Sequence, residues 1–324
     1  MDRPRPRAAA LGLAIATAAG ALGLAAEPGA IRAFRWAAQD VDPQAAFARE
    51  PTECLTLPTG RAEALKVEVG RAAFRTPLLL GGQAARAGVA CETCHAGGRS
   101  NPTFLFPGVS GAPGTADVTD SLFSSHRGDG IDNPRPIPDL SGPKARLKVD
   151  QSRASRKLEP FIRGLIVEEF DGPEPPPAVL DGLAAYVRAL SPAACPRAAS
   201  APVTPSLYLE DARRAVRAAE GEIGSGDAPG AVLMLAAART RLGQIDERFA
   251  GDRLAAVRAA IRRQDDRLAA AQEAVRQGRA DARAGLEAWL SDSVRLEAVL
   301  RAKAPRSLFD PRRLTQAFRR RLPG

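Results

Sequence analysis

Two cysteines and one histidine lie within five residues of a chain that has four cysteines and two histidines in all. The stretch reads GVACETCHAGG and spans residues 88–98, with Cys91, Cys94 and His95 at its centre. Three kinds of chemistry use thiols and an imidazole at this spacing. They are a redox dithiol, half of a zinc site, and the covalent attachment of a haem.

The surroundings of the motif argue against the first two. A thioredoxin-like dithiol lies between a strand and a helix, whereas glycines and alanines flank this motif without any strand-like run. A zinc site needs further ligands at suitable spacing. Beyond the motif the chain offers Cys54, His126 and Cys195, none of which belongs to a second paired cluster.

Haem attachment uses all three residues of the motif. Two thiols separated by two residues reach the two vinyl groups of one porphyrin edge, and the adjacent histidine lies beneath the iron as its axial ligand. We therefore predict one haem c, attached through thioethers to Cys91 and Cys94, with His95 as the proximal iron ligand.

The sixth iron ligand decides what such a haem does. A strong second ligand favours electron transfer, whereas an open position lets peroxide or another small molecule bind. His126, in a loop expected to surround the haem, and Met234, in a helical segment, are the candidates. The alternatives are a surface histidine and a methionine that fills a core; if neither binds, the iron is five-coordinate or takes Lys, Tyr or water. Arg127 and Arg135 are candidate partners of the haem propionates, or else face solvent.

The elements predicted around the motif are helices and one long loop. Leu65, Val69 and Phe74 share a face of a helix before the motif. From about residue 100 to residue 144, glycine and proline recur every few residues, and so long a loop needs something to surround, which a haem provides. Two amphipathic helices follow, with apolar faces made by Leu158, Phe161, Ile162, Leu165, Ile166 and Phe170, and by Val179, Leu180, Leu183, Val187 and Leu190. We expect the first and last of these helices to cross.

The C-terminal half has a different pattern. An Ala- and Pro-rich segment at 196–205 is typical of a linker. Apolar residues at steps of three and four in residues 206–303 predict about four helices with short connections. Residues 304–324 form a basic tail. The predicted fold class is all-α: a cytochrome c-like haem domain with long loops at 50–195, followed by an antiparallel helical bundle.

Residues 1–30 resemble an export signal or an N-terminal membrane anchor. Three arginines precede an uncharged apolar run at residues 8–26. We therefore expect a periplasmic protein, soluble or associated with the inner membrane through its N-terminus. In that oxidising compartment Cys54 and Cys195, which flank the haem domain, are expected to form a disulfide rather than remain two free thiols.

The net charge of +9 identifies no particular partner. Three of the positive charges belong to the leader, and most others alternate with Asp and Glu along helical patterns, as on solvated helix faces. We expect redox partner proteins and no nucleic acid. The excess of basic charge would attract an acidic redox partner.

Several stretches resemble a known family. VGRAAFRTPLLLGGQAARAGVACETCH resembles the opening of a haem domain from the bacterial cytochrome c peroxidase and methylamine-utilisation di-haem group. NPRPIPDL, LEPFIRGLIVEEFDG and LDGLAAYVRAL resemble its close. The resemblance covers roughly residues 64–191 and does not reach the bundle. Because those enzymes carry two haems and this chain has one attachment motif, the resemblance does not imply two-haem peroxidase chemistry.

The sequence thus predicts an exported mono-haem c-type cytochrome that carries out one-electron transfer. Two alternatives remain open. One is a peroxidase-like haem enzyme with an accessible iron, and the other is a haem-containing interaction subunit of a membrane or periplasmic redox complex.

Overall fold

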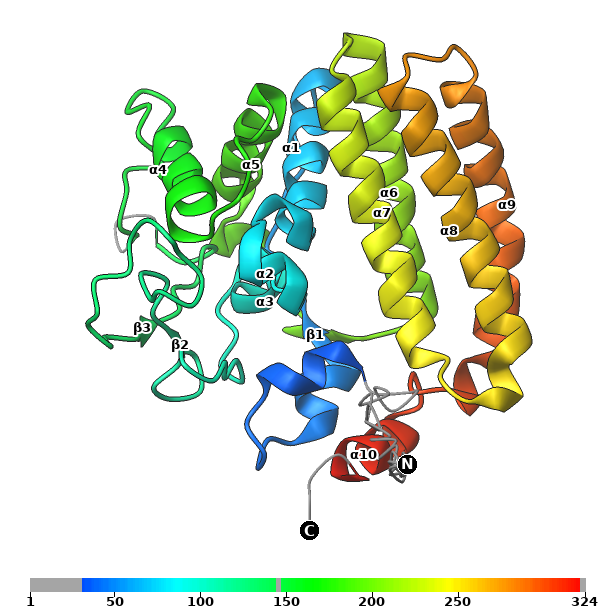
Figure 1. Ribbon diagram of the computed structural model, residues 1–324, viewed down its shortest axis with the longest axis horizontal. Helices are drawn as coiled ribbons and strands as arrows, with labels where there is room; N and C mark the ends of the chain where they lie inside the picture. The colour runs from blue at the N-terminus through cyan, green and yellow to red at the C-terminus, as the bar shows by residue number, and fades with distance from the viewer. Residues whose placement is uncertain (1–30, 144–146, 321–324) are drawn as a thin grey trace, which may run out of the picture.

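The computed structural model describes residues 31–143 and 147–320, so the predicted export signal at 1–30 lies outside the described residues. Helices dominate the described chain, and its strands form two small two-stranded sheets (Figure 1). The all-α class is confirmed. Among the described residues, no helix has the length and apolar character needed to cross a membrane.

The N-terminal part contains the motif and short elements around it. Its α-helices are α1 (Arg61–Phe74), α2 (Gly82–Ala87), α3 (Cys91–Cys94), α4 (Leu158–Gly164) and α5 (Pro177–Ala189). Its 3₁₀ and π turns are η1 (Arg32–Trp36), η2 (Gln44–Ala48), η3 (Pro77–Leu79), η4 (Ala96–Gly98), η6 (Leu165–Glu169) and η7 (Pro192–Ala194). Its strands are β1 (Arg49–Pro51), β2 (Thr115–Ala116), β3 (Arg135–Pro136) and β4 (Ser200–Pro202).

The helices α1 and α5 cross in direct backbone contact (Figure 1). A Cβ atom on Gly70 would lie 1.9 Å from the carbonyl oxygen of Gly182, and a Cβ on Gly182 would lie 2.9 Å from the Gly70 nitrogen. Only glycine at these positions lets the two backbones approach so closely. The predicted crossing of the first and last helices is therefore confirmed.

The Gly- and Pro-rich loop is held together by backbone pairing. The strands β2 and β3 pair antiparallel, with Thr115 opposite Pro136. Next to this pair, the Ile137 N–H donates to the Gly114 carbonyl oxygen at 3.0 Å. This pairing holds residues 114–116 and 135–137 of the loop together.

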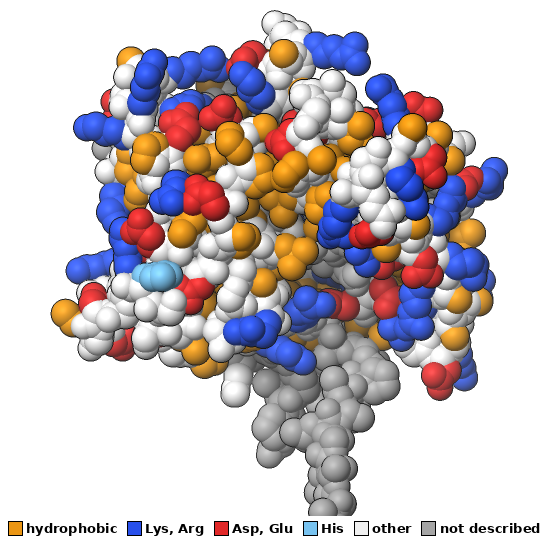
Figure 2. All heavy atoms as spheres, turned by 45° about the horizontal axis from the view of Figure 1, so that its top comes forward, with side chains coloured by type: hydrophobic (Ala, Val, Ile, Leu, Met, Phe, Trp, Pro, Cys, Tyr) orange, Lys and Arg blue, Asp and Glu red, His pale blue; other side chains and the backbone are white. Residues whose placement is uncertain are grey.

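The C-terminal part is the expected four-helix bundle. Its helices are α6 (Pro205–Ser225), α7 (Ala228–Arg248), α8 (Ala255–Arg276) and α9 (Ala282–Lys303). Local capping sets the starts of α6 and α7: the Thr204 hydroxyl accepts from the Leu207 N–H, and the Asp227 carboxylate accepts from the Gly230 N–H. Lys, Arg, Asp and Glu side chains are interspersed on the face drawn in Figure 2, as expected for solvated helix faces.

The tail forms a further helix, α10 (Pro311–Arg320), which packs on the N-terminal segment. Phe318 of α10 lies edge-on to Phe34 of η1, with ring centroids 5.2 Å apart. The basic residues of the tail therefore lie on a helix that has its own apolar contacts.

The two parts share a continuous apolar core. The helix α6 packs on α1, where a Cβ on Gly221 would lie 2.6 Å from Leu65. The expected linker at 196–205 contains β4, which pairs antiparallel with β1 and places Ser200 opposite Pro51. Its composition resembles a linker, but backbone pairing, which composition does not reveal, ties the segment into the fold.

Candidate functional site

The Cys-Glu-Thr-Cys-His motif begins in a single helical turn, α3. Gly88, with a positive φ of 76°, ends α2, and the Ala90 N–H then donates to the Thr93 hydroxyl oxygen at 2.9 Å. Residues three apart on a helical turn share a face, and both Cys91 and Cys94 line one cavity.

That cavity has a volume of about 460 Å³ and mostly apolar walls. This volume lies in the range of about 300–1,000 Å³ that is typical of small-molecule and cofactor sites. The crossing helices line it through Phe74 of α1 and through Leu183 and Val187 of α5. The amphipathic helix α4 and the turn η6 contribute Phe161, Ile162, Leu165 and Ile166. The apolar face that the sequence predicted for α4 is therefore turned toward the cavity.

His95 also lines the cavity, and its ring nitrogen Nδ1 already has a hydrogen-bond partner. Its Nδ1 lies 3.0 Å from the Pro138 carbonyl oxygen. Because a carbonyl oxygen only accepts, Nδ1 carries the proton of a neutral ring and Nε2 keeps its lone pair. Burial lowers the pKa of His95 to about 4, so the ring is neutral at physiological pH. This is the tautomer and orientation that metal-binding histidines adopt.

The thiols do not resemble a reactive dithiol. Burial raises the pKa of both Cys91 and Cys94 to about 12, whereas redox-active cysteines have lowered pKa values. Within the described chain, no cluster of three or more His, Cys, Asp or Glu side chains is arranged to hold a metal ion. The raised thiol pKa values therefore do not support a redox dithiol.

The residues present fit a covalently bound haem. Two thiols on one helical turn, a histidine whose Nε2 keeps its lone pair and an apolar cavity of cofactor size form the required set. The exposed Arg135, a candidate propionate partner, lines the cavity. Lys148, which sequence reasoning did not single out, is also exposed and lines it.

The structure does not place His126 at this cavity. Its side chain is 62% exposed, its Nε2 lies 3.8 Å from an Asp171 carboxylate oxygen, and it is not among the cavity-lining residues. The preceding residue is held by the same carboxylate, since the Ser125 N–H and hydroxyl donate to Asp171 at 2.9 Å. These contacts keep the histidine at the surface, so the structure does not support it as the sixth ligand.

Two further candidate residues also lie outside the cavity lining, and Met234 takes the alternative role of filling a core. Met234 is fully buried in α7 within the apolar core and is not part of the cavity lining. Arg127 is not part of the lining either, because its guanidinium pairs with Glu168 and Glu169. A propionate would therefore have to compete with two carboxylates for Arg127.

Glu169 is a cavity residue that sequence reasoning missed. Its side chain is only 5% exposed, one oxygen accepts from Arg127 at 3.1 Å, and the other is buried without a hydrogen-bond partner. Burial raises its pKa. The signal was present in the sequence, because Glu169 follows Leu165 by four residues and Ile166 by three and so falls on their apolar face.

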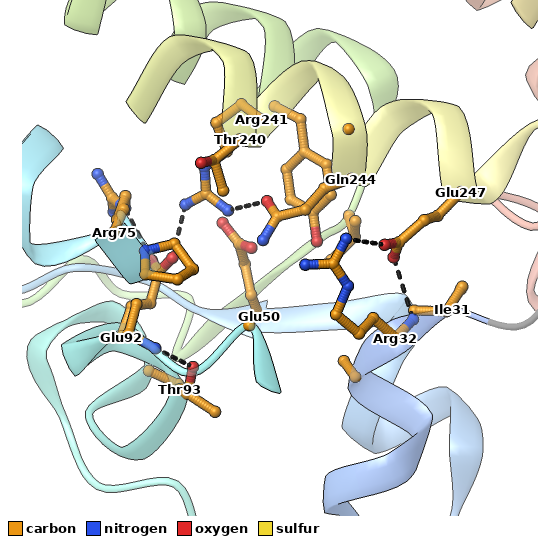
Figure 3. A pocket seen from close by; sticks show the side chains of 18 of the residues that line it. Ile31, Arg32, Glu50, Arg75, Glu92, Thr93, Thr240, Arg241, Gln244 and Glu247 are labelled. Atoms are coloured by element: carbon orange, nitrogen blue, oxygen red, sulfur yellow. Dashed lines mark hydrogen bonds and ion pairs between the residues drawn. The ribbon is translucent and has the colours of Figure 1, made fainter. Parts of the chain in front are cut away.

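A buried ion network connects the motif to the bundle (Figure 3). One carboxylate oxygen of Glu92 lies 2.7 Å from Nε of Arg75, the residue after α1, and the other lies 2.6 Å from Arg241 Nη2 of α7. Arg241 also pairs with Asp211 of α6 at 3.1 Å, and Arg75 pairs with Glu53 at 2.6 Å. The second residue of the motif is thus held from both halves of the chain.

Glu53 remains ionised inside this network. Burial raises its pKa, but Arg75 and Arg71 outweigh that effect and lower it to about 2. The Tyr186 hydroxyl also donates to Glu53, at 2.8 Å. The network therefore carries charge at neutral pH.

A second hollow lies on the other side of the motif, between α3 and α7. It has a volume of about 930 Å³, and the Glu50 carboxylate points into it toward Arg241 and Gln244 (Figure 3). Burial and the neighbouring Glu92 raise the pKa of Glu50 to about 7. This hollow is lined by many more charged side chains than the apolar cavity that the two cysteines line.

Comparisons with known proteins give no assignment: no family model, no curated protein and no solved structure matches this chain significantly.

Proposed function

We propose that this chain is an exported mono-haem c-type cytochrome that carries out one-electron transfer. The observation that carries the proposal is that Cys91, Cys94 and His95 line one apolar cavity of about 460 Å³. The cytochrome c-like fold and the relation to the bacterial di-haem peroxidase group belong to the same proposal. The crossing of α1 and α5 beside the cavity supports them.

Each group of residues has a defined task in this proposal. When bound, the haem supplies an iron that accepts and releases one electron. Cys91 and Cys94 attach the porphyrin edge, and the Pro138 carbonyl oxygen fixes the ring of His95 so that Nε2 is available to the iron. Arg135 supplies a positive charge for a propionate.

The walls of the cavity contribute through their low polarity. Apolar side chains from α1, α4, η6 and α5 exclude water from the site. The surroundings of a haem iron, including burial and hydrogen bonding to its ligands, set its reduction potential. A haem held between these helices would therefore have a potential determined mainly by this chain.

A second candidate function is peroxidase-like chemistry at an accessible iron. Two observations favour it: neither His126 nor Met234 lines the cavity, and Glu169 presents a buried, unpartnered carboxyl oxygen there. A carboxyl group with a raised pKa is able to exchange a proton with a small molecule bound beside it. The interaction-subunit interpretation stays a prediction, with the bundle as its candidate binding surface.

Absorption spectra separate the two candidates, using protein exported from a host that attaches haem c. Electron transfer predicts a low-spin spectrum that cyanide and carbon monoxide do not change. High-spin iron together with peroxide turnover would contradict simple electron transfer and support the second candidate. Polypeptide that leaves the host without covalent haem would contradict both.

A further inference from the structure

The helix α10 separates its apolar residues from its basic ones. Leu314 and Phe318 are buried, and they form one apolar cluster with Ile31 and Phe34. Four arginines of the helix are exposed: Arg312, Arg313, Arg319 and Arg320. Successive residues are about 100° apart around a helix, so these arginines lie within an arc of about 120° that is centred on Gln316 and opposite the buried pair. We call this arc the basic face of α10.

Carboxylates do not neutralise the basic face. The helix Pro311–Arg320 contains no Asp or Glu. Within residues 31–143 and 147–320, no carboxylate forms an ion pair with its four guanidiniums. The adjacent Asp310 is engaged at the start of the helix, where one oxygen accepts from the backbone N–H groups of Arg312 and Arg313. On the bundle helix α8, by contrast, the exposed Arg276 pairs with a carboxylate three residues earlier.

The composition of the basic face favours a charged surface over a protein as its partner. The cores of protein interfaces bury apolar and aromatic side chains. In α10, Leu314 and Phe318 are already buried against the N-terminal segment, so the outer arc consists of arginines and Gln316. Anionic phospholipid headgroups attract such a basic segment by charge alone.

The place of α10 beside the N-terminal segment fits the same partner. The apolar run that resembles an export signal or a membrane anchor ends at residue 26. Ile31 follows five residues later, and five residues of extended chain span at most about 18 Å. Because Ile31 packs in the same apolar cluster as α10, a retained anchor would hold the helix near the bilayer surface.

We propose that the basic face of α10 docks on the anionic phospholipid surface of a membrane. Guanidinium groups bind phosphate oxygens through paired N–H donors. The helix would lie on the headgroups without inserting, because Leu314 and Phe318 stay in the protein core. This inference goes beyond the proposed function and does not depend on a haem, since α10 does not line the cavity of the two cysteines.

Modification of arginine by phenylglyoxal, located by mass spectrometry in the exported protein, tests this proposal. Vesicles of phosphatidylcholine and phosphatidylglycerol in equal amounts should slow modification of the α10 arginines severalfold, and vesicles of phosphatidylcholine alone should not. Arg263, which is exposed on α8, is the internal control and should react at the same rate with both. A retained anchor would insert into both kinds of vesicle, so the difference between them reports the basic face.

Salt gives a second readout of the same contact. Raising the salt concentration to about 1 M shortens the Debye length to about 3 Å. Protection of the α10 arginines by the anionic vesicles should therefore disappear at high salt.

Two double variants separate the basic face from net charge. Each basic residue beside an anionic surface changes the docking equilibrium about fivefold, so Arg312→Gln with Arg319→Gln should shift it about 25-fold toward the free state. The two remaining arginines of α10 should lose their protection accordingly. Arg262→Gln with Arg263→Gln is the matched control, because it removes the same charge from exposed positions of α8. That variant should retain the protection of α10.

Absence of protection by the anionic vesicles would overturn the proposal, and so would equal protection by both kinds of vesicle or full protection in the α10 double variant. Protection by polyglutamate but not by anionic vesicles would also overturn it and would identify an acidic protein as the partner. Circular dichroism establishes that both double variants stay folded. Failure of the proposed function is distinguishable, because the Soret band of the same samples reports the haem separately.

Discussion

Replacing Gly70 by alanine should destabilise the protein even though alanine favours helix. The new Cβ would lie 1.9 Å from the Gly182 carbonyl oxygen, and contacts under 3.0 Å are essentially never observed for a Cβ. The helices α1 and α5 must therefore separate by about 1 Å at their crossing. Overpacking of this kind costs about 1–3 kcal/mol, and the helix preference of alanine returns up to about 1 kcal/mol. From the upper end of that range, we expect a net loss of about 2 kcal/mol.

Urea denaturation of the purified protein measures this loss. Gly243→Ala is the matched control, because Gly243 lies within α7 and a Cβ there would meet nothing within 4 Å. That variant should be up to about 1 kcal/mol more stable than the wild type. A Gly70→Ala protein as stable as the Gly243→Ala protein would refute the direct backbone contact between α1 and α5.

Three further predictions concern bonds that connect distant parts of the chain. The structure contains a disulfide between Cys54 and Cys195, which are 141 positions apart. Changing both cysteines to serine should lower the free energy of unfolding by about 4–5 kcal/mol on the chain-entropy model. Equal urea midpoints for variant and wild type would speak against the bond. Arg241→Met leaves Glu92 without one of its two buried partners and should lower the free energy of unfolding by about 3–5 kcal/mol. Adding Glu92→Gln should restore part of that loss in the double variant. Strictly additive losses would show that the pair is not coupled. The pKa of Glu53 is lowered from 4.5 to about 2, so the ionised carboxylate stabilises the fold above pH 4.5, and this contribution disappears as the pH falls toward about 2. Glu53→Gln should therefore be less stable than the wild type at neutral pH and should lose less stability on acidification. Parallel profiles of stability against pH for the two proteins would contradict this.

Sequence periodicity predicted the elements that depend on local spacing. The crossing helices and the four bundle helices follow apolar repeats, and the bundle breaks at glycines such as Gly226, Gly251 and Gly278, which have positive φ. A left-handed backbone favours glycine in any context. These signals depend only on residues that are close together in the sequence and require no tertiary information.

What the sequence did not indicate concerns directions that only the tertiary structure decides. A position in a cavity-forming loop does not say which way a side chain points, and contacts of Ser125 with Asp171 hold His126 outside. The pair formed by Glu92 and Arg241 joins residues 149 positions apart, so nothing near the motif indicates that the bundle holds it. The Ala- and Pro-rich segment at 196–205 resembles a linker until its pairing with β1 is known.

Whether a haem is attached at Cys91 and Cys94 is decided by the intact mass of the exported protein under denaturing conditions. The proposal predicts a mass higher than that of the polypeptide by one haem, and the polypeptide mass alone when both cysteines are changed to serine. A wild-type chain of polypeptide mass, from cells that load a second c-type cytochrome normally, would contradict it.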